Sequence, residues 1–287
     1  MCCDEIIVTT KLTIVATKVN DYLFFTSKFS PINMKNKPPR LKSHPAIIGR
    51  NPVLEALEGN TEIDKVYIQK GVRGEFEKSI RKICKQKTIP LAVVPKEKLN
   101  YFYRGNHQGI VALMSLIEYQ KIEDILPKAY EDSEQPLFVL LDKVTDIRNV
   151  GAIARSAEIF GAHAVIISRK GGAFINEEAI KASAGALLNI PVCREQSLRQ
   201  TVNYLKDSGV SVFCADLSGD QAIHEVDFKA PVCIVMGAEG KGINPDLLLH
   251  VNNKFKIPQI GVTDSLNVSV ATGVILYEIQ RQRRLTT

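Results

Sequence analysis

The chain has 287 residues, of which 45% are hydrophobic, and a formal net charge of +6. This length predicts a large core divided between two modest domains, and no apolar run is long enough to span a bilayer. The six cysteines form no CxxC pair and no zinc-finger spacing with histidine, so we expect neither a metal site nor a disulfide framework. Because Asp4 and Glu5 stand where a secretory signal is basic, we expect a cytoplasmic protein.

The excess of basic over acidic residues lies in the first part of the sequence. Residues 1–43 and 44–120 each carry a net charge of +4, whereas the remainder carries −2. A basic front attached to a nearly neutral body predicts that the front meets a polyanion, most simply nucleic acid. The alternative is that this charge serves only solubility.

The first 44 residues are expected to be a poorly ordered extension and linker. Short strand-like patches up to residue 30 are followed by a segment rich in Pro, Lys and Asn that ends near Pro45. Met34 stands within this segment, and we hypothesise that the working protein starts there.

Residues 45–118 alternate between helical and strand patterns, which predicts a small α/β domain. Its second helix, EFEKSIRKICKQ, is amphipathic and basic. Such a charge run is more often a solvated face than a binding site, but together with a later loop it could face RNA. The candidate RNA-binding residues are Arg50, Arg73, Arg81, Lys85, Arg104 and His107.

The charged stretch 119–135 is expected to be a linker, and residues 136–287 to form the second domain. Beyond the linker, strands such as LFVLLD, AVIIS and PVCIVMG alternate with helices and are apolar on both faces. This pattern indicates a parallel sheet covered on both sides. A ligand site is expected beyond the carboxyl ends of its strands.

The first of three chemically informative clusters spans residues 141–161. Asn149 is predicted to cap the helix that follows, and Arg155 lies six residues later in an otherwise apolar run. A guanidinium in such a helix needs an anion or a carboxylate, because it cannot lose its charge on burial. A structural salt bridge, with Glu239 as the candidate partner, is the alternative to a functional role.

The second and third clusters lie at 232–243 and 255–278. In the second, a buried strand enters a loop with glycines at 237, 240 and 242, whose spacing fits neither a dinucleotide fingerprint nor a P-loop. In the third, Ser265 is predicted to cap an apolar helix whose positive end would suit an anionic group. An ordinary capped core helix is the alternative. Loops at the carboxyl ends of parallel strands would share one pocket, which is a cofactor site by position.

Together these clusters resemble the three motifs of the SpoU (TrmH-like) branch of the SPOUT RNA methyltransferases. They read NVGAIARSA, GAEGKG and IPQIGVTDSLNVSVA, in that order, and the resemblance covers roughly residues 137–284. In the front domain, IIGRNPVLEAL and the later HQGIVA resemble the substrate-binding domain, similar to ribosomal protein L30e, of bacterial enzymes that methylate a guanosine ribose in large-subunit rRNA. Residues 1–43 match nothing in this pattern.

The resemblance implies an α/β fold in which a parallel-sheet SPOUT domain with a trefoil knot follows a small L30e-like domain. It also implies a homodimer that binds S-adenosylmethionine in the knot. By motif position, the cofactor would contact Gly237, Ala238, Gly240, Ile257, Pro258, Leu266 and Asn267. The polar catalytic group would comprise Asn149, Arg155, Glu239, Ser265 and Asn267.

The implied activity is 2′-O-methylation of a ribose in RNA, with a guanosine of 23S rRNA as the expected target. One alternative is a tRNA substrate. A second is an RNA-binding or ribosome-assembly factor without catalysis, for which Arg155, Glu239 and Asn267 would be unnecessary. A nucleotide-dependent oxidoreductase is a third, and the missing GxGxxG weakens it. No metal, membrane or DNA partner is expected.

Overall fold

The computed structural model describes residues 6–9, 12–19, 22–27, 45–132, 135–169, 171–251, 253–262 and 265–284. The chain divides into two compact units, Met1–Arg40 and Leu41–Thr287. The first contains an antiparallel sheet of β1 (Ile6–Thr9), β2 (Leu12–Val19) and β3 (Tyr22–Ser27). The expected linker before Pro45, with Met34, lies outside the described residues.

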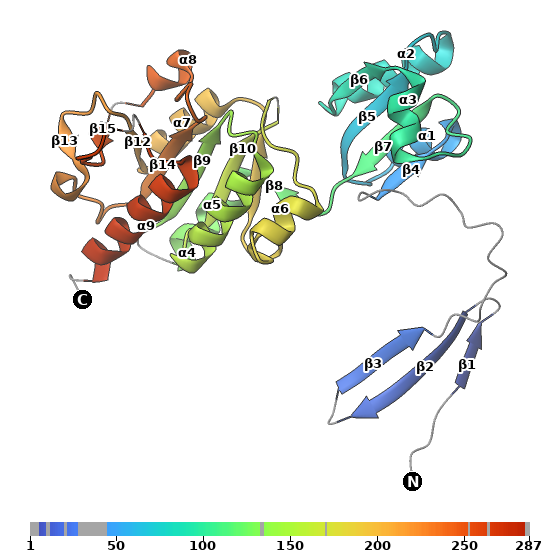
Figure 1. The fold of residues 1–287 in the computed structure, drawn as a ribbon, viewed down its shortest axis with the longest axis horizontal. Coiled ribbons are helices and arrows are strands. Elements are labelled where there is room, and N and C mark those ends of the chain that lie inside the picture. The colour runs from blue at the N-terminus through green and yellow to red at the C-terminus, as the bar shows by residue number, and fades with distance from the viewer. Residues whose placement is uncertain are drawn as a thin grey trace. The chain divides into compact units, whose positions relative to one another are not determined.

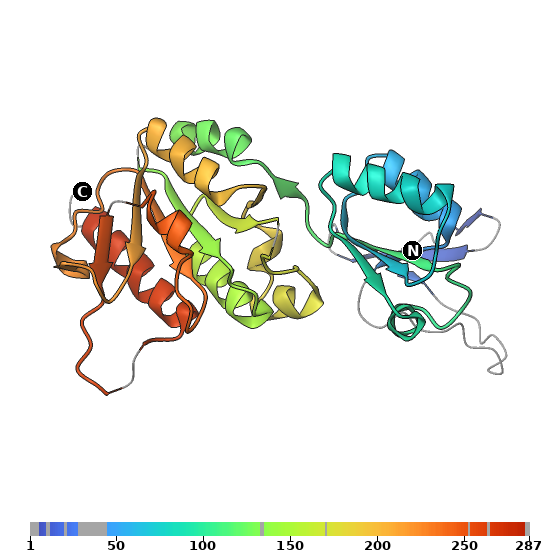
Figure 2. The same ribbon diagram turned by 90° about the horizontal axis from the view of Figure 1, so that it is seen from above.

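The second unit begins with a four-stranded mixed sheet in the order β4-β7-β5-β6. Helices α1 (Arg50–Glu58) and α2 (Glu75–Gln86) pack on one face, and α3 (Lys96–Phe102) packs on the other (Figure 2). Helix α2 is amphipathic because Ile80 and Cys84, four residues apart, share its buried side. The strands are β4 (Ala46–Ile48), β5 (Ile63–Gln69), β6 (Leu91–Val94) and β7 (Ile110–Met114).

The expectation of a linker over 119–135 is wrong. Strand β8 (Tyr119–Gln120) pairs with the main sheet, and α4 (Ile122–Asp132) follows it directly. The apolar side of α4 is buried in the core, through Ile122, Ile125, Leu126 and Ala129. The many charged residues of this segment occupy the exposed positions, and they concealed the helical spacing of the apolar ones.

The main sheet has eight strands in the order β13-β15-β12-β14-β9-β10-β11-β8, and every pairing in it is parallel (Figure 1). The parallel sheet expected from the sequence is therefore confirmed. Its other strands are β9 (Leu137–Asp142), β10 (Ala164–Ser168), β11 (Val192–Glu195), β12 (Ser211–Ala215), β13 (Gln221–Ala222), β14 (Val232–Gly237) and β15 (Asn253–Lys256).

Helices cover both faces of this sheet (Figure 2). Side chains alternate along β9: Phe138 and Leu140 pack with α4, α7 (Leu198–Asp207) and α8 (Pro245–Leu248). Leu137, Val139 and Leu141 pack on the other face, with α5 (Ile147–Ile159), α6 (Glu177–Ala182) and α9 (Val268–Arg284). Short 3-10 turns occur at Ala186–Leu188 and Ile223–Glu225. None of the helices in the described ranges is long and apolar enough to cross a membrane.

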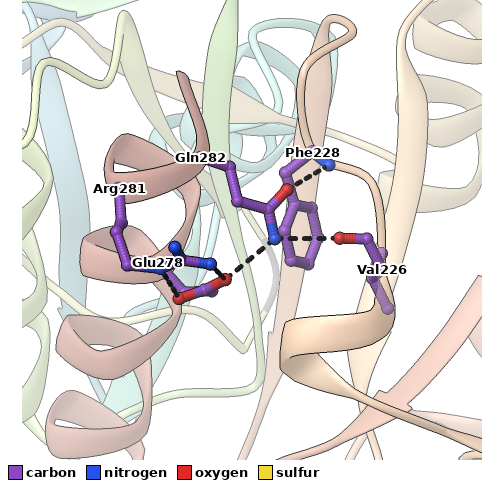
Figure 3. A network of polar contacts seen from close by, with 5 residues as sticks. All are labelled: Val226, Phe228, Glu278, Arg281 and Gln282. Carbon is purple, nitrogen blue, oxygen red and sulfur yellow. Dashed lines mark hydrogen bonds and ion pairs between the residues drawn. The ribbon is translucent and has the colours of Figure 1, made fainter. Parts of the chain in front are cut away.

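The last turns of α9 are anchored to the segment before β14. Gln282 donates to the Val226 carbonyl (2.9 Å) and accepts from the Phe228 amide (3.0 Å), while Glu278 pairs with Arg281 beside it (Figure 3). The next residue, Arg283, donates to the carbonyl oxygens of Phe228, Ala230 and Gln135. These bonds fix the end of the helix whose start borders the candidate site.

Candidate active site

A pocket of about 510 Å³ lies at the carboxyl ends of β12, β14 and β15. This is the position expected for a ligand site in a parallel sheet, and the volume is typical of small-molecule sites. The lining comes from four chain segments: Ala215, Asp216 and Leu217; Met236, Gly237, Ala238, Glu239, Gly240, Gly242 and Ile243; Ile257 and Gln259; and Ser265, Leu266, Val268 and Ala271.

The glycines of the second cluster allow the loop after β14 to fold tightly on itself. Ala238 and Gly242 exchange two backbone hydrogen bonds, of 3.1 and 2.8 Å, while Gly240 and Gly242 adopt left-handed backbone angles (φ 74° and 64°). A Cβ at Gly237 would lie 2.3 Å from the carbonyl carbon of Gly242. No side chain fits at position 237 without displacing the returning backbone, so a glycine is required there.

Asp216 is a pocket residue that the sequence analysis missed. Its Oδ1 accepts from the Ser218 amide (2.8 Å) and from the Ser218 hydroxyl (2.7 Å). These hydrogen bonds lower the pKa of Asp216 below its usual value, so the pocket contains a carboxylate at neutral pH. The available signal was an acidic residue directly after a parallel strand, the same kind of position as the three clusters.

Asn267, and not Ser265, caps α9. The Asn267 Oδ1 accepts from the Ser269 amide (2.9 Å) and hydroxyl (2.6 Å), and its Nδ2 donates to the Asn149 Oδ1 (3.1 Å). The cap predicted at Ser265 is therefore wrong, because the helix begins three residues later, at Val268. Ser265 is exposed and lines the pocket.

The cap predicted at Asn149 is wrong for a similar reason. Asp146 caps α5 by accepting from the Arg148 amide (2.8 Å), which places Asn149 in the first turn. Both residue types are good caps, and the earlier one occupies the position. Asn149 is thereby available to contact the start of α9.

Arg155 lies on α5, six residues beyond Asn149, and is exposed. This exposure contradicts the burial expected for it. Arg155 forms no ion pair among the described residues, so the alternative of a structural salt bridge with Glu239 is contradicted as well. Glu239 is also exposed and lines the pocket. The guanidinium is therefore accessible to a ligand from solution.

The other residues proposed for the cofactor fall mainly in this pocket. Gly237, Ala238, Gly240, Ile257 and Leu266 line it, whereas Pro258 and Asn267 are adjacent in sequence to lining residues without lining it themselves. The arrangement combines apolar side chains, closely approaching backbone and the carboxyl groups of Asp216 and Glu239. It could hold a small molecule that has both apolar and cationic parts.

The residues proposed for RNA binding separate into two groups. Arg73, Arg81, Lys85 and Arg104 are exposed, and Arg81 pairs with Glu77 (2.6 Å). Arg50 and His107 line a second pocket.

Within the lining of this second pocket, His107 is buried beneath the surface. His107 is only 4% exposed; its Nδ1 accepts from the Gly109 amide (3.0 Å) and its Nε2 bonds the Asn100 Oδ1 (3.2 Å). Burial, and secondarily the charge of Lys96, lower its pKa, which favours a neutral imidazole that supports the loop.

Comparison with known proteins matches both parts of the second unit. Residues 136–277 match the model of the SpoU rRNA Methylase family, and residues 46–120 match the model described as RNA 2′-O ribose methyltransferase substrate binding. YacO of Bacillus subtilis (strain 168), which is assigned to the TrmH family of tRNA/rRNA methyltransferases, is 34% identical over 243 residues. The alignment covers 84% of this chain and 97% of YacO.

Solved structures share this fold. An AdoMet-bound rRNA methyltransferase from Sinorhizobium meliloti superposes with a TM-score of 0.53 at 26% identity, over 84% of this chain and 87% of that one. The SpoU methyltransferase AviRb from Streptomyces viridochromogenes, in complex with AdoMet, gives 0.54 at 22% identity, over 84% and 91%. The α/β fold with its parallel sheet is thus the one found in SpoU methyltransferases.

Proposed function

The chain belongs to the SpoU family of RNA methyltransferases, and on that premise we propose that it methylates a ribose 2′-hydroxyl of RNA with S-adenosylmethionine. A guanosine of 23S rRNA is the proposed target. The observation that carries the proposal is the convergence of the second and third sequence clusters on one pocket, with the first cluster joined to them through Asn149 and Asn267.

The pocket suits the cofactor chemically. Met236, Ile257, Leu266 and Val268 supply apolar surface for the adenine, and Gly237 keeps the backbone free of a Cβ. Asp216 supplies a carboxylate that would favour the cationic part of the molecule. When bound, S-adenosylmethionine supplies an electrophilic methyl group on its sulfonium.

The polar residues of this chain would position the RNA. The exposed guanidinium of Arg155 would bind the phosphate next to the target ribose and stabilise negative charge on its 2′-oxygen. A guanidinium does not give up its proton, so the ribose proton would pass to that phosphate or to water. Asn149, Asn267 and Glu239 would hold the ribose, while Ser265 would stay at the pocket wall.

We also propose the two finer structural features implied by the family resemblance. Residues 237–243 border the pocket, as do residues 257–259 and 265–268, which is consistent with a trefoil knot formed by these segments. The four-stranded sheet with its three helices is consistent with an L30e-like domain over residues 45–118 that binds the RNA substrate.

A homodimer is supported by an apolar surface on α5 and α9. Val270, Val274 and Tyr277 of α9 are 52%, 39% and 59% exposed, and Ile159 of α5 is 62% exposed. The two helices lie side by side, because Gln280 donates to the Phe160 carbonyl (2.7 Å). A patch of this kind marks an interaction site, and we propose a second copy of the chain as its occupant.

Val274→Glu should convert a dimer into a monomer in analytical ultracentrifugation, and a wild-type monomer would contradict the dimer.

Calorimetry tests the cofactor. We expect S-adenosylhomocysteine to bind and NAD not to bind; RNA binding without S-adenosylhomocysteine binding would favour the non-catalytic factor instead.

Single-turnover methylation tests Arg155. Arg155→Lys should lose most of the rate, because an ammonium cannot replace the planar donor fork. Nearly full activity of Arg155→Lys would rule out a specific role for the guanidinium.

A further inference from the structure

We propose that a second pocket, in the small domain, binds an unpaired nucleotide of the substrate RNA with its base stacked on Arg50. This inference rests on the proposed function and adds the structural class of RNA that the small domain recognises. The pocket, which we call the Arg50 pocket, measures about 670 Å³, and its polar lining includes Arg50, Gln69, Lys96, Asn106 and Gln108.

Contacts with Phe76 and Gln108 hold the side chain of Arg50, whose planar guanidinium can serve as a stacking platform. Its guanidinium carbon lies 5.0 Å from the centre of the Phe76 ring, its Nε donates to the Gln108 carbonyl (3.3 Å), and its backbone amide donates to the Gln108 Oε1 (2.9 Å). The guanidinium thus lies over the Phe76 ring, and Arg50 is nevertheless exposed. A planar guanidinium with an accessible face is a surface on which proteins stack unpaired bases.

The loop 106–109, which contacts Arg50, is held in a fixed backbone conformation. Gln108 has a left-handed backbone (φ 50°) although it is not a glycine, and Gly109 follows with φ 79°. The Asn106 Oδ1 accepts from the Gln108 amide (3.2 Å), and buried His107 bonds the Gly109 amide beneath. An unusual backbone conformation fixed by its surroundings is characteristic of ligand-binding sites.

The chemistry of the Arg50 pocket matches a nucleotide. None of the described residues that line it is acidic, while Arg50 and Lys96 are cationic and suit a phosphate. The side-chain amides of Gln69, Asn106 and Gln108 offer both donors and acceptors to the edge of a base. Bases inside an RNA duplex cannot reach such a pocket, so the nucleotide must be unpaired. An acidic peptide would use the cations but not the stacking surface.

The test measures binding of the full chain to an RNA hairpin with an unpaired loop and to a duplex of the same composition. Wild type should prefer the hairpin. Arg50→Lys keeps the charge and loses the plane, so it should weaken hairpin binding by about tenfold, the size of a stacking contribution, and leave duplex binding unchanged. Gln108→Gly tolerates the left-handed backbone and removes one tether of Arg50, so it should also weaken hairpin binding. Arg199→Lys, the same exchange at an exposed residue of α7 outside the pocket, is the matched control and should preserve the preference.

A hairpin whose loop nucleotides lack bases should bind wild type and Arg50→Lys equally. The proposal is overturned if Arg50→Lys binds the normal hairpin as wild type does, if it weakens hairpin and duplex equally, or if poly-glutamate competes as well as the hairpin. Calorimetry with S-adenosylhomocysteine on the same samples separates the two proposals. If wild type does not bind S-adenosylhomocysteine, the proposed methyltransferase reaction is contradicted, whereas the result with the hairpin still supports the Arg50 pocket.

Discussion

The side-chain amide of Asn267 donates to the Oδ1 of Asn149 across 3.1 Å, and this bond joins the N-terminal cap of α9 to the first turn of α5. At the other end of the same pair of helices, Gln280 donates to the Phe160 carbonyl. The two helices therefore run side by side in the same direction. Because the Asn267 oxygen caps α9, its amide nitrogen is directed to Asn149. One side chain thus serves both the helix cap and the geometry of the site.

Replacement of Asn267 should separate these two roles. Asn267→Ala removes the cap and should lower the free energy of unfolding by about 1 kcal/mol in urea denaturation. Asn267→Ser keeps a capping oxygen and should leave stability near the wild-type value. Both variants lose the bond to Asn149, so single-turnover methylation should fall by about tenfold or more. Wild-type rates in Asn267→Ser would show that the amide has no positioning role.

Gly237→Ala should damage the proposed cofactor pocket. The new methyl group would clash with the Gly242 backbone, and overpacking of this kind costs about 1–3 kcal/mol. We expect calorimetry to show a fall of about tenfold or more in affinity for S-adenosylhomocysteine. Gly261→Ala is the control, because a Cβ there meets nothing within 4 Å. Equal affinities for the two variants would contradict the tight turn.

Asp216→Asn should weaken S-adenosylmethionine binding several-fold, because the substitution removes a negative charge near a cationic ligand. The folded state lowers the pKa of Asp216, so its stabilising bonds to Ser218 are present above the usual aspartate pKa and are lost only as pH falls through the lowered value. Wild-type affinity should therefore stay constant from about pH 8 to 5. A decline within that range that Asp216→Asn abolishes would contradict this account.

Arg283→Met should destabilise the protein by about 3 kcal/mol, because three backbone carbonyls lose a charged donor at a partly buried position. Burial lowers the pKa of Arg283 to about 10, which leaves the side chain cationic at neutral pH. Arg281→Met removes only a surface ion pair with Glu278 and should cost less than about 1 kcal/mol. Urea denaturation of both variants makes the comparison, and equal losses would contradict the anchoring role of Arg283.

The cysteines of the two α/β domains should be inert in the folded protein. Cys84, Cys193, Cys214 and Cys233 are buried free thiols, and burial raises the pKa of Cys84 and Cys214 to about 11. In a variant with serine at positions 2 and 3, maleimide should label four thiols in urea and none in buffer at pH 7. Labelling of the folded protein would show that one of these sites opens.

Much of the main sheet could be predicted from the sequence, because its strands are buried on both faces and therefore appear as continuous apolar runs. The common pocket followed from the same reasoning, since the carboxyl ends of parallel strands meet at one edge. Gly237 and Leu266 line the pocket at that edge. Asp216 follows the same rule and was missed because no glycine cluster accompanied it.

The predictions of helix caps, of side-chain burial and of the linker were wrong where several residues compete for one position or where exposure depends on tertiary packing. Asp146 and Asn149 are both good caps, and only the course of the chain decides between them. Arg155 was expected to be buried because its neighbours are apolar, yet it lies on the exposed side of α5. Helix α4 was concealed by its charged outer face. Sequence spacing alone does not resolve such choices.

The central claim is that the protein methylates a ribose 2′-hydroxyl of RNA. The most direct test maps 2′-O-methyl sites in the rRNA and tRNA of cells with and without this gene. We expect one guanosine of 23S rRNA to lose its 2′-O-methyl group, and reintroduction of wild type, but not of Arg155→Lys, to restore it. Loss of a tRNA site alone would correct the substrate and keep the reaction. An unchanged 2′-O-methyl map in both RNA classes would contradict the account.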